Sequence, residues 1–269
     1  MSDTHAVTTP SLPPRGDLRR RVLAGEPSIG AWVNLGSVVS AELVARAGFD
    51  WVVLDLEHGM GSEADIHPQL LAVQGTPTAA LVRPASSERL RVGRALDLGA
   101  DGLVVPRLET PAEVAETLAW MRYPPAGTRG VALTTRGGGY FGIAHPDLAS
   151  SVNERLLGVF QVESPVAVAA ADELAAIDGV DVLFVGPADL SHAMAMPGRF
   201  AEPAFTDALD RVVAACRANG KAAGILLADA SLVPAYLERG FTFLGVGSDS
   251  GWVVSGAAAQ VAAGRAALA

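Results

Sequence analysis

The sequence predicts an α/β fold in which eight parallel strands and their helices close into a single (β/α)8 barrel. Eight short apolar runs alternate with longer helix-like stretches along the chain. The runs are rich in Val, Leu and Phe and almost continuously apolar, which is typical of strands covered by helices. A length of 269 residues also suits a barrel of this kind as one domain.

The eight predicted strands follow one another at intervals that leave room for a helix. In order, they are the runs near 30–36, 49–57, 78–84, 102–108, 156–163, 181–189, 222–229 and 241–249. An open doubly wound sheet is the alternative architecture. It is the weaker one because no GxGxxG sequence opens a helix after the first strand.

Helical patterns fill most of the gaps between these runs. The stretch 40–48 has a candidate N-cap in Ser40 and ends at Gly48. Similar patterns cover 86–100, 110–122, 164–177, 203–220 and 229–240. Two connections, 122–142 and 192–204, are longer than the rest. The first contains Pro-Pro and Gly-Gly-Gly, and its length makes it a candidate functional loop.

Composition limits the kinds of partner. The net charge is −9, so the chain repels nucleic acid and anionic membranes. There is no stretch of about 18 apolar residues and no secretory signal, and the lone Cys216 cannot form an intrachain disulfide. These features predict a cytoplasmic protein with a flexible tail, 1–18, and one domain, 19–269. The low share of charged residues, 18%, indicates burial of surface in an oligomer.

Ionisable and polar residues follow several of the predicted strands. They are Asp55, Glu57 and His58 after the second run, Arg83 in the third, Gln161 and Glu163 in the fifth, and Asp189 in the sixth. Chemistry in a (β/α)8 barrel takes place at the carboxyl ends of the strands. We therefore expect these side chains to meet at one mouth of the barrel.

Each of these residues has two interpretations at this stage. Glu163 and Asp189 could bind Mg2+ or Mn2+ through oxygen, or they could cap the helices that follow them. Arg83 could hold a substrate carboxylate or a structural ion pair. His58 could be a general base or a solvated loop residue. Asp97 could be an ordinary polar residue near the end of a helix.

Sequence motifs of several other enzyme classes are missing. The chain has no HxxxH, CxxC, GxSxG or GxxxxGK[ST] sequence, which leaves no support for a zinc hydrolase, a serine hydrolase or a P-loop enzyme. Lys221 is the only lysine, and it comes at the start of a predicted strand. A lysine at that end of the barrel could not form a Schiff base with a substrate at the mouth.

At these residues the chain resembles the HpcH/HpaI aldolase family, the metal-dependent class II pyruvate aldolases. The resemblance covers roughly residues 28–250 in the family's order. The matching stretches are GFDWVVLDLEHG (48–59), LVRP (81–84), ALDLGADGLVVPRLETPAEV (95–114), RYPPAGTRG (122–130), FQVES (160–164), GVDVLFVGPADLS (179–191) and GKAAGILLAD (220–229).

The resemblance implies roles for named residues. It implies that Glu163 and Asp189 bind a divalent metal (Mg2+, Mn2+ or Co2+) and that Arg83 binds the carboxylate and stabilises an enolate. His58 falls on the family's acid/base histidine, and Asp97 on its partner. The remaining implied substrate contacts are Gln161, the backbone amides of Ala188 and Asp189, and Trp252. The last helix is implied to exchange between subunits, usually within a hexamer.

The implied activity is reversible cleavage of a 4-hydroxy-2-oxo acid to pyruvate, or a related acid such as hydroxypyruvate, plus an aldehyde. Two alternatives stay open: a CoA-dependent lyase of the citrate lyase β-chain type, and a non-catalytic metabolite-binding barrel. The chain departs from its relatives in TTRGGGYFG (134–142) and in GSDSGWV (247–253), which contains Trp252. Trp252 could narrow an aldehyde pocket or fill a core or interface, so the natural substrate stays open.

Overall fold

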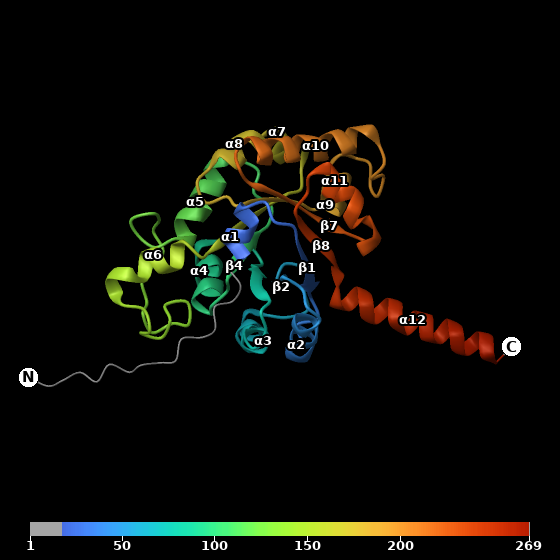
Figure 1. The fold of residues 1–269 in the computed structure, drawn as a ribbon, viewed down its shortest axis with the longest axis horizontal. Helices are drawn as coiled ribbons and strands as arrows, with labels where there is room; N and C mark the ends of the chain where they lie inside the picture. Colours follow the sequence, from blue (N-terminus) through green and yellow to red (C-terminus); the bar gives the residue numbers. More distant parts are fainter. Residues whose placement is uncertain (1–17, 269) are drawn as a thin grey trace, which may run out of the picture.

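The computed structural model describes residues 18–268 and contains a closed barrel of eight parallel strands. Each strand pairs with its neighbours in sequence, and the first pairs with the last (Figure 1). The strands are β1 (Ser28–Val33), β2 (Trp51–Asp55), β3 (Ala79–Arg83), β4 (Gly102–Val105), β5 (Leu157–Val162), β6 (Val182–Val185), β7 (Ala222–Leu227) and β8 (Phe243–Ser248). All eight predicted strands and the predicted fold class are confirmed.

Helices fill the connections between strands. They are α1 (Leu18–Leu23), α2 (Val38–Arg46), α3 (Glu63–Gln74), α4 (Arg89–Asp97), α5 (Pro111–Met121), α6 (Leu148–Asn153), α7 (Pro165–Ala169), α8 (Ala171–Ala176), α9 (Pro187–Ala193), α10 (Pro203–Ala218), α11 (Val233–Arg239) and α12 (Asp249–Ala267), with short 3-10 turns η1 (His145–Asp147) and η2 (Ala230–Leu232). The sequence did not single out α3, which carries Pro68 in its interior and spreads its apolar residues widely.

The inside of the barrel is packed with aromatic rings. The Trp51 and Phe243 rings stack with centroids 4.1 Å apart, and Trp32 lies 5.2 Å from Phe184. Glycines make room for these rings, because a Cβ at Gly30 would lie 2.0 Å from Trp51 and one at Gly245 would lie 2.7 Å from Trp32. Burying each ring contributes about 2–3 kcal/mol. The filled interior leaves only the strand ends for chemistry.

The amino-terminal end of the barrel is covered by α1. Leu18 and Val22 of this helix pack into the interior cluster, and Arg19 pairs with the buried Asp181 at 2.9 Å. The predicted flexible tail therefore extends one residue too far, since Leu18 already belongs to the helix. The rest of that prediction, residues 1–17, falls outside the described residues.

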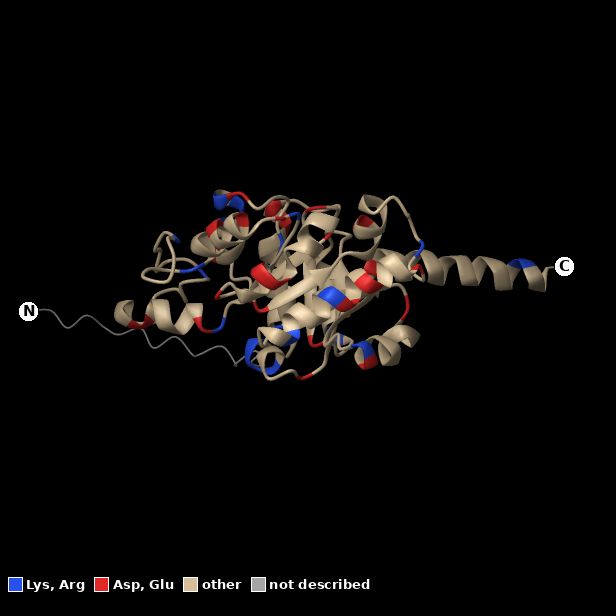
Figure 2. Cartoon of the chain, turned by 90° about the horizontal axis from the view of Figure 1, so that it is seen from above, with Lys and Arg blue, Asp and Glu red and all other residues tan. Residues whose placement is uncertain are grey.

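The last helix does not cover the barrel. α12 extends away from it in Figure 1, and its residues from Gly251 onward are exposed. Figure 2 shows this helix with very few charged residues, and its exposed side chains include Val253, Val254 and Val261. On the barrel, Ile29 of β1 is 41% exposed. No helix of the described residues is long and apolar enough to cross a membrane.

The long 122–142 connection lies at the amino-terminal end of the barrel. It follows the C-terminus of α5 and, through α6, leads into the start of β5. The sequence suggested it as a functional loop, which would need to stand at the carboxyl end of the strands. Within one chain it lies at the other end, so any role at the mouth must be in a neighbouring subunit.

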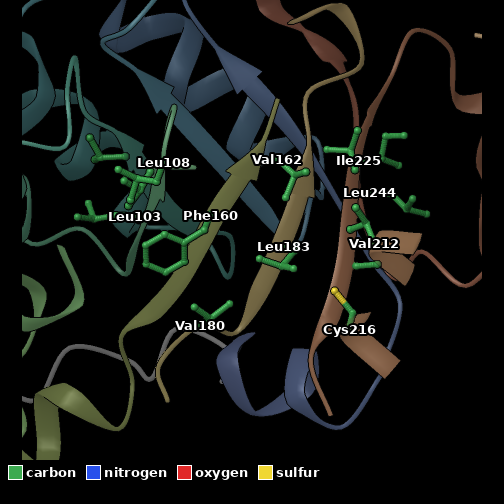
Figure 3. Packing of buried hydrophobic residues seen from close by; sticks show 14 of the residues in the cluster. Leu103, Leu108, Phe160, Val162, Val180, Leu183, Val212, Cys216, Ile225 and Leu244 are labelled. Carbon is green, nitrogen blue, oxygen red and sulfur yellow. The ribbon is translucent and has the colours of Figure 1, made fainter. Parts of the chain in front are cut away.

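Cys216 packs between α10 and the sheet as a small apolar residue, beside the side chains shown in Figure 3. Burial raises the pKa of its thiol to about 12. At pH 8 only about one thiol in ten thousand is then ionised, and the thiolate is the form that reacts with disulfide reagents.

We therefore expect no reaction of the native protein with 5,5′-dithiobis(2-nitrobenzoate) at pH 8 over minutes. In concentrated guanidinium chloride the same reagent should titrate one thiol per chain, because the sequence contains one cysteine. Prompt stoichiometric reaction of the folded protein would show that the helix–sheet packing around Cys216 opens readily.

Candidate active site

Alternation along the strands decides which side chains enter the barrel. Trp32, Trp51, Leu81 and Val159 belong to the interior cluster. Side chains on a strand repeat their direction every two residues. Asp55, Arg83, Gln161 and Glu163 therefore point inward at the carboxyl ends of β2, β3 and β5. The prediction that polar strand ends converge on one mouth is confirmed for these residues by the contacts below.

Arg83 holds the centre of this group. Its Nε and Nη2 donate to the two oxygens of Asp55 at 2.8 and 2.7 Å, and Nη1 forms an ion pair with Glu57 at 2.9 Å. Its guanidinium also lies 6.0 Å from the centre of the Trp32 ring. Burial alone would lower the pKa of Arg83, but the hydrogen bonds and charge of Asp55 outweigh it and raise the pKa.

Gln161 connects this guanidinium to the next carboxylate. Its amide Nε2 donates to Glu163 Oε1 at 2.7 Å, while its Oε1 accepts from Arg83 Nη1 at 3.4 Å. The backbone N–H of Arg107 also donates to the Glu163 carboxylate. A Cβ at Gly186 would lie 2.7 Å from Glu163 Oε1, so glycine at the end of β6 leaves space for this side chain.

Glu163 has an unusual ionisation. Burial, and then the negative charges of Asp189 and Glu57, raise its pKa to about 7, although Arg83 opposes the shift. Asp55, Glu57, Glu163 and Asp189 set four carboxylates against one guanidinium, a formal charge of −3 when all are ionised. A site with this excess of oxygen anions fits a divalent cation.

The carboxylates form no dense metal cage. Within residues 18–268, no group of three or more His, Cys, Asp or Glu side chains is arranged around one point. Glu163 and Asp189 could hold a cation only if water and substrate oxygens filled its remaining positions. Ala188 and Asp189 stand in the first turn of α9, where backbone amides have no partner within the helix.

His58 stands at the rim of the mouth. Its side chain is 60% exposed, its Nε2 lies 3.9 Å from Glu57 Oε2, and its backbone N–H donates to Asp55. The structure therefore places His58 next to the buried carboxylates with its ring facing solvent. A substrate reaching the mouth can contact the ring.

Asp97 does not lie beside His58 within one chain. α4 begins after the carboxyl end of β3 and ends at Asp97, near the start of β4, so this carboxylate is at the opposite end of the barrel. There it accepts from Arg129 at 2.8 Å, and the Arg129 guanidinium lies 4.4 Å from the centre of the Tyr123 ring. Within one chain the two residues therefore lie at opposite ends of the barrel, and the His58–Asp97 pair stays a prediction.

Trp252 stands in the first turn of α12, directly after the carboxyl end of β8. Its ring stacks on Phe49, with centroids 5.7 Å apart and planes 7° apart. Phe49 precedes β2 and packs against the helix–sheet core. Trp252 remains 39% exposed, so the contacts within one chain leave both interpretations of this residue as predictions.

Sequence reasoning named Asp55 and Glu57 at the mouth but did not predict their ion pairs with Arg83. These ion pairs join residues about 28 positions apart, and no local sequence pattern reveals such a pairing.

A cavity of about 270 Å³ lies near the amino-terminal end of the barrel, away from these carboxylates. It is lined by Val22, Arg217, Lys221 and Thr242 among others. Lys221 directly precedes β7, as expected.

Comparison with known proteins identifies the family. The model of the HpcH/HpaI aldolase/citrate lyase family matches residues 28–256. The chain belongs to this family. It is 38% identical to a 4-hydroxy-2-oxo-heptane-1,7-dioate aldolase from Salmonella arizonae, over 89% of this chain and 90% of the relative. It is also 38% identical to a 5-keto-4-deoxy-D-glucarate aldolase from Klebsiella pneumoniae, over 85% and 88%.

A solved structure shares the fold as well. An HpcH/HpaI aldolase/citrate lyase family protein from Burkholderia cenocepacia superposes with a TM-score of 0.86 and 35% identity, covering 92% of this chain and 98% of that one. The predicted aldolase activity is confirmed at the level of reaction type: the protein is a carbon–carbon lyase acting on small molecules. Similarity to these aldolases favours an enzyme over a non-catalytic binding barrel.

The repulsion around Glu163 predicts a stability effect in metal-free protein. A raised carboxyl pKa means that the folded state holds this proton more tightly than the unfolded state. Stability from the group is therefore lost as pH rises from about 4.5 through about 7. Glu163→Gln cannot ionise. At pH 8 its free energy of unfolding should be about 1–3 kcal/mol higher than that of wild type, and at pH 4.5 the two should differ little.

The measurement is urea unfolding of chelator-treated protein at the two pH values. Glu116→Gln, on the exposed face of α5, is the matched control and should change stability little at either pH. Destabilisation of Glu163→Gln at pH 8 would contradict the picture of a buried, repelled carboxylate.

Proposed function

We propose that this aldolase reversibly cleaves a 4-hydroxy-2-oxo acid to pyruvate or a closely related 2-oxo acid plus an aldehyde, using a divalent metal held by Glu163 and Asp189. The observation that supports this most directly is the buried group of Arg83, Gln161 and Glu163 at the barrel mouth. The names of two relatives, both aldolases acting on oxo diacids, support it too.

The residues divide the work by charge. A bound divalent metal supplies Lewis acidity to the 2-oxo group of the substrate. Arg83, fixed by Asp55, places positive charge where the oxygen of that group becomes negative, and the unpaired amides of Ala188 and Asp189 can receive the carboxylate. Gln161 orients Glu163 through its amide.

Cleavage also requires a base at the C4 hydroxyl. His58, on the rim beside Glu57, takes that proton as the C3–C4 bond breaks and the aldehyde carbonyl forms. The electron pair of the broken bond moves onto the 2-oxo fragment, which is later protonated at C3. No lysine is needed, and Lys221 stands at the other end of the barrel.

The test is release of 2-oxo acid from synthetic 4-hydroxy-2-oxo acids, followed with a coupled dehydrogenase. Activity should vanish after chelation and return with Mg2+, Mn2+ or Co2+. Glu163→Ala and Asp189→Asn should not recover. Arg83→Ala should lower turnover by about 10²–10³, with poor rescue by lysine, since one lost oxyanion donor has about this effect.

Full activity of metal-free Glu163→Ala would refute the metal assignment. Cleavage that requires a CoA thioester, with none of the free acid, would instead favour the citrate lyase type of reaction.

We further propose that the active unit is an oligomer, a hexamer in its simplest form, in which α12 packs on a neighbouring subunit. The projecting helix, its exposed valines and the 41% exposed Ile29 of β1 support this. Asp97 and the 122–142 loop, at the amino-terminal end of one barrel, would reach His58 at the mouth of another. His58 and Asp97 then form their acid/base pair between subunits.

Subunit mixing tests this arrangement. His58→Ala and Asp97→Asn should each be strongly impaired, yet randomly reassembled mixtures should recover activity, with about a quarter of sites intact. The matched control mixes His58→Ala with Arg83→Ala. Since both residues belong to the mouth of one chain, that mixture should stay inactive. Failure of the first mixture to recover, with mixed oligomers confirmed by mass spectrometry, would place the pair elsewhere.

A further inference from the structure

Arg107 occupies a special position beside the proposed metal site. It is the second residue after β4, in the loop that leads to α5 at the carboxyl end of the barrel. Its backbone is left-handed, with φ of 59°, a conformation that costs energy for any residue with a Cβ. Its N–H donates to the Glu163 carboxylate. The turn that aims this amide at Glu163 therefore does not require an arginine, and glycine would adopt it more easily.

The Arg107 side chain has no partner among residues 18–268. It is exposed, and no hydrogen bond or ion pair involves its guanidinium in that part of the chain. Glu109, two residues further along, accepts no bond from it. Arg83, by contrast, uses its guanidinium on Asp55 and Glu57. Arg107 is thus a cation at the rim of the mouth whose hydrogen-bonding capacity is unused.

The negative charge around the mouth indicates how such a cation could act on an anionic substrate. The chain carries −9 overall, and four carboxylates surround Arg83 at the site. The carboxylates of the mouth would repel the second carboxylate of a diacid substrate. That distal group lies beyond the reach of Arg83 and of the proposed metal. Because the Arg107 amide touches Glu163, its guanidinium lies within one side-chain length of the metal-binding carboxylate. That span is comparable with the length of a short dicarboxylic acid.

We propose that Arg107 binds the distal carboxylate of a dicarboxylic 4-hydroxy-2-oxo acid and so determines specificity for diacids. A guanidinium fork matches a carboxylate in geometry and charge. The inference rests on the proposed function, since it assumes that the 2-oxo end of the substrate lies at Arg83 and Glu163. It adds a residue that distinguishes diacids from monoacids of the same length.

The test compares two matched ligands that cannot be cleaved because they lack the C4 hydroxyl. Calorimetry measures binding of 2-oxoheptanedioate and 2-oxoheptanoate to the full chain with Mg2+. Wild type should bind the diacid about ten-fold more tightly, or better, the effect expected of one charge-assisted contact. Arg107→Gln should bring the ratio close to one, and Arg107→Lys should give an intermediate value. Arg217→Gln, which removes an exposed arginine at the other end of the barrel, should keep the wild-type ratio.

Three results would each overturn the assignment. Wild type shows no preference for the diacid, Arg107→Gln retains that preference, or Arg107→Gln loses it only together with Mn2+ affinity, which would make Arg107 a support for Glu163 alone. If wild type binds neither acid and cleaves no 4-hydroxy-2-oxo acid, the proposed function itself fails, and this inference with it.

Discussion

The charge balance at the barrel mouth is the constraint on which the site depends. One guanidinium, that of Arg83, stands among four carboxylates, and two of them, Asp55 and Glu57, are already used to hold it. Glu163 and Asp189 are left with each other, and the pKa of Glu163 rises to about 7 as a result of burial and this repulsion. A fold without a cation bears this cost in stability. The divalent ion proposed for this site would relieve the repulsion and so gain binding free energy from it, and a preformed, electrostatically strained site is a common way of coupling stability to function.

The filled interior of the barrel gives this arrangement its rigidity. Trp32 lies 6.0 Å from the Arg83 guanidinium and packs against the rings of Trp51 and Phe184, so the guanidinium rests on a packed aromatic layer. Gly30 and Gly245 leave space for these rings, because a Cβ at either position would clash with them. Gly186 leaves space for the Glu163 side chain in the same way. Small residues at the strands thus decide where large and charged ones can stand. The packed rings below the mouth oppose movement of its polar groups into the barrel.

Much of this could be predicted from sequence, for physical reasons that differ between elements. Near-continuous apolar runs revealed the eight strands, because both faces of each strand are covered. Their positions at the ends of predicted strands placed Arg83, Gln161 and Glu163 at one mouth. α3 was missed because Pro68 and a diffuse apolar pattern hide its helical period. The Arg83–Asp55 contact and the Phe49–Trp252 stack depend on how the barrel closes, and a single sequence does not encode such pairings in a local pattern. The assignments of metal, base and substrate contacts came from family resemblance and stay predictions.

The position of Asp97 has a consequence for how the enzyme is built. A βα unit sends its helix from the carboxyl end of one strand to the amino end of the next, so a helix-terminal residue such as Asp97 can never reach the mouth of its own barrel. The 122–142 loop is subject to the same rule, since it follows the end of α5. Arg129 of that loop holds Asp97, and Tyr140 and Phe141 stand exposed in left-handed backbone, which few side chains adopt without compensation. If these features act in catalysis, they act on another subunit. The projecting α12 then matters to the chemistry, because the contacts that hold subunits together also bring the amino end of one barrel to the mouth of the next.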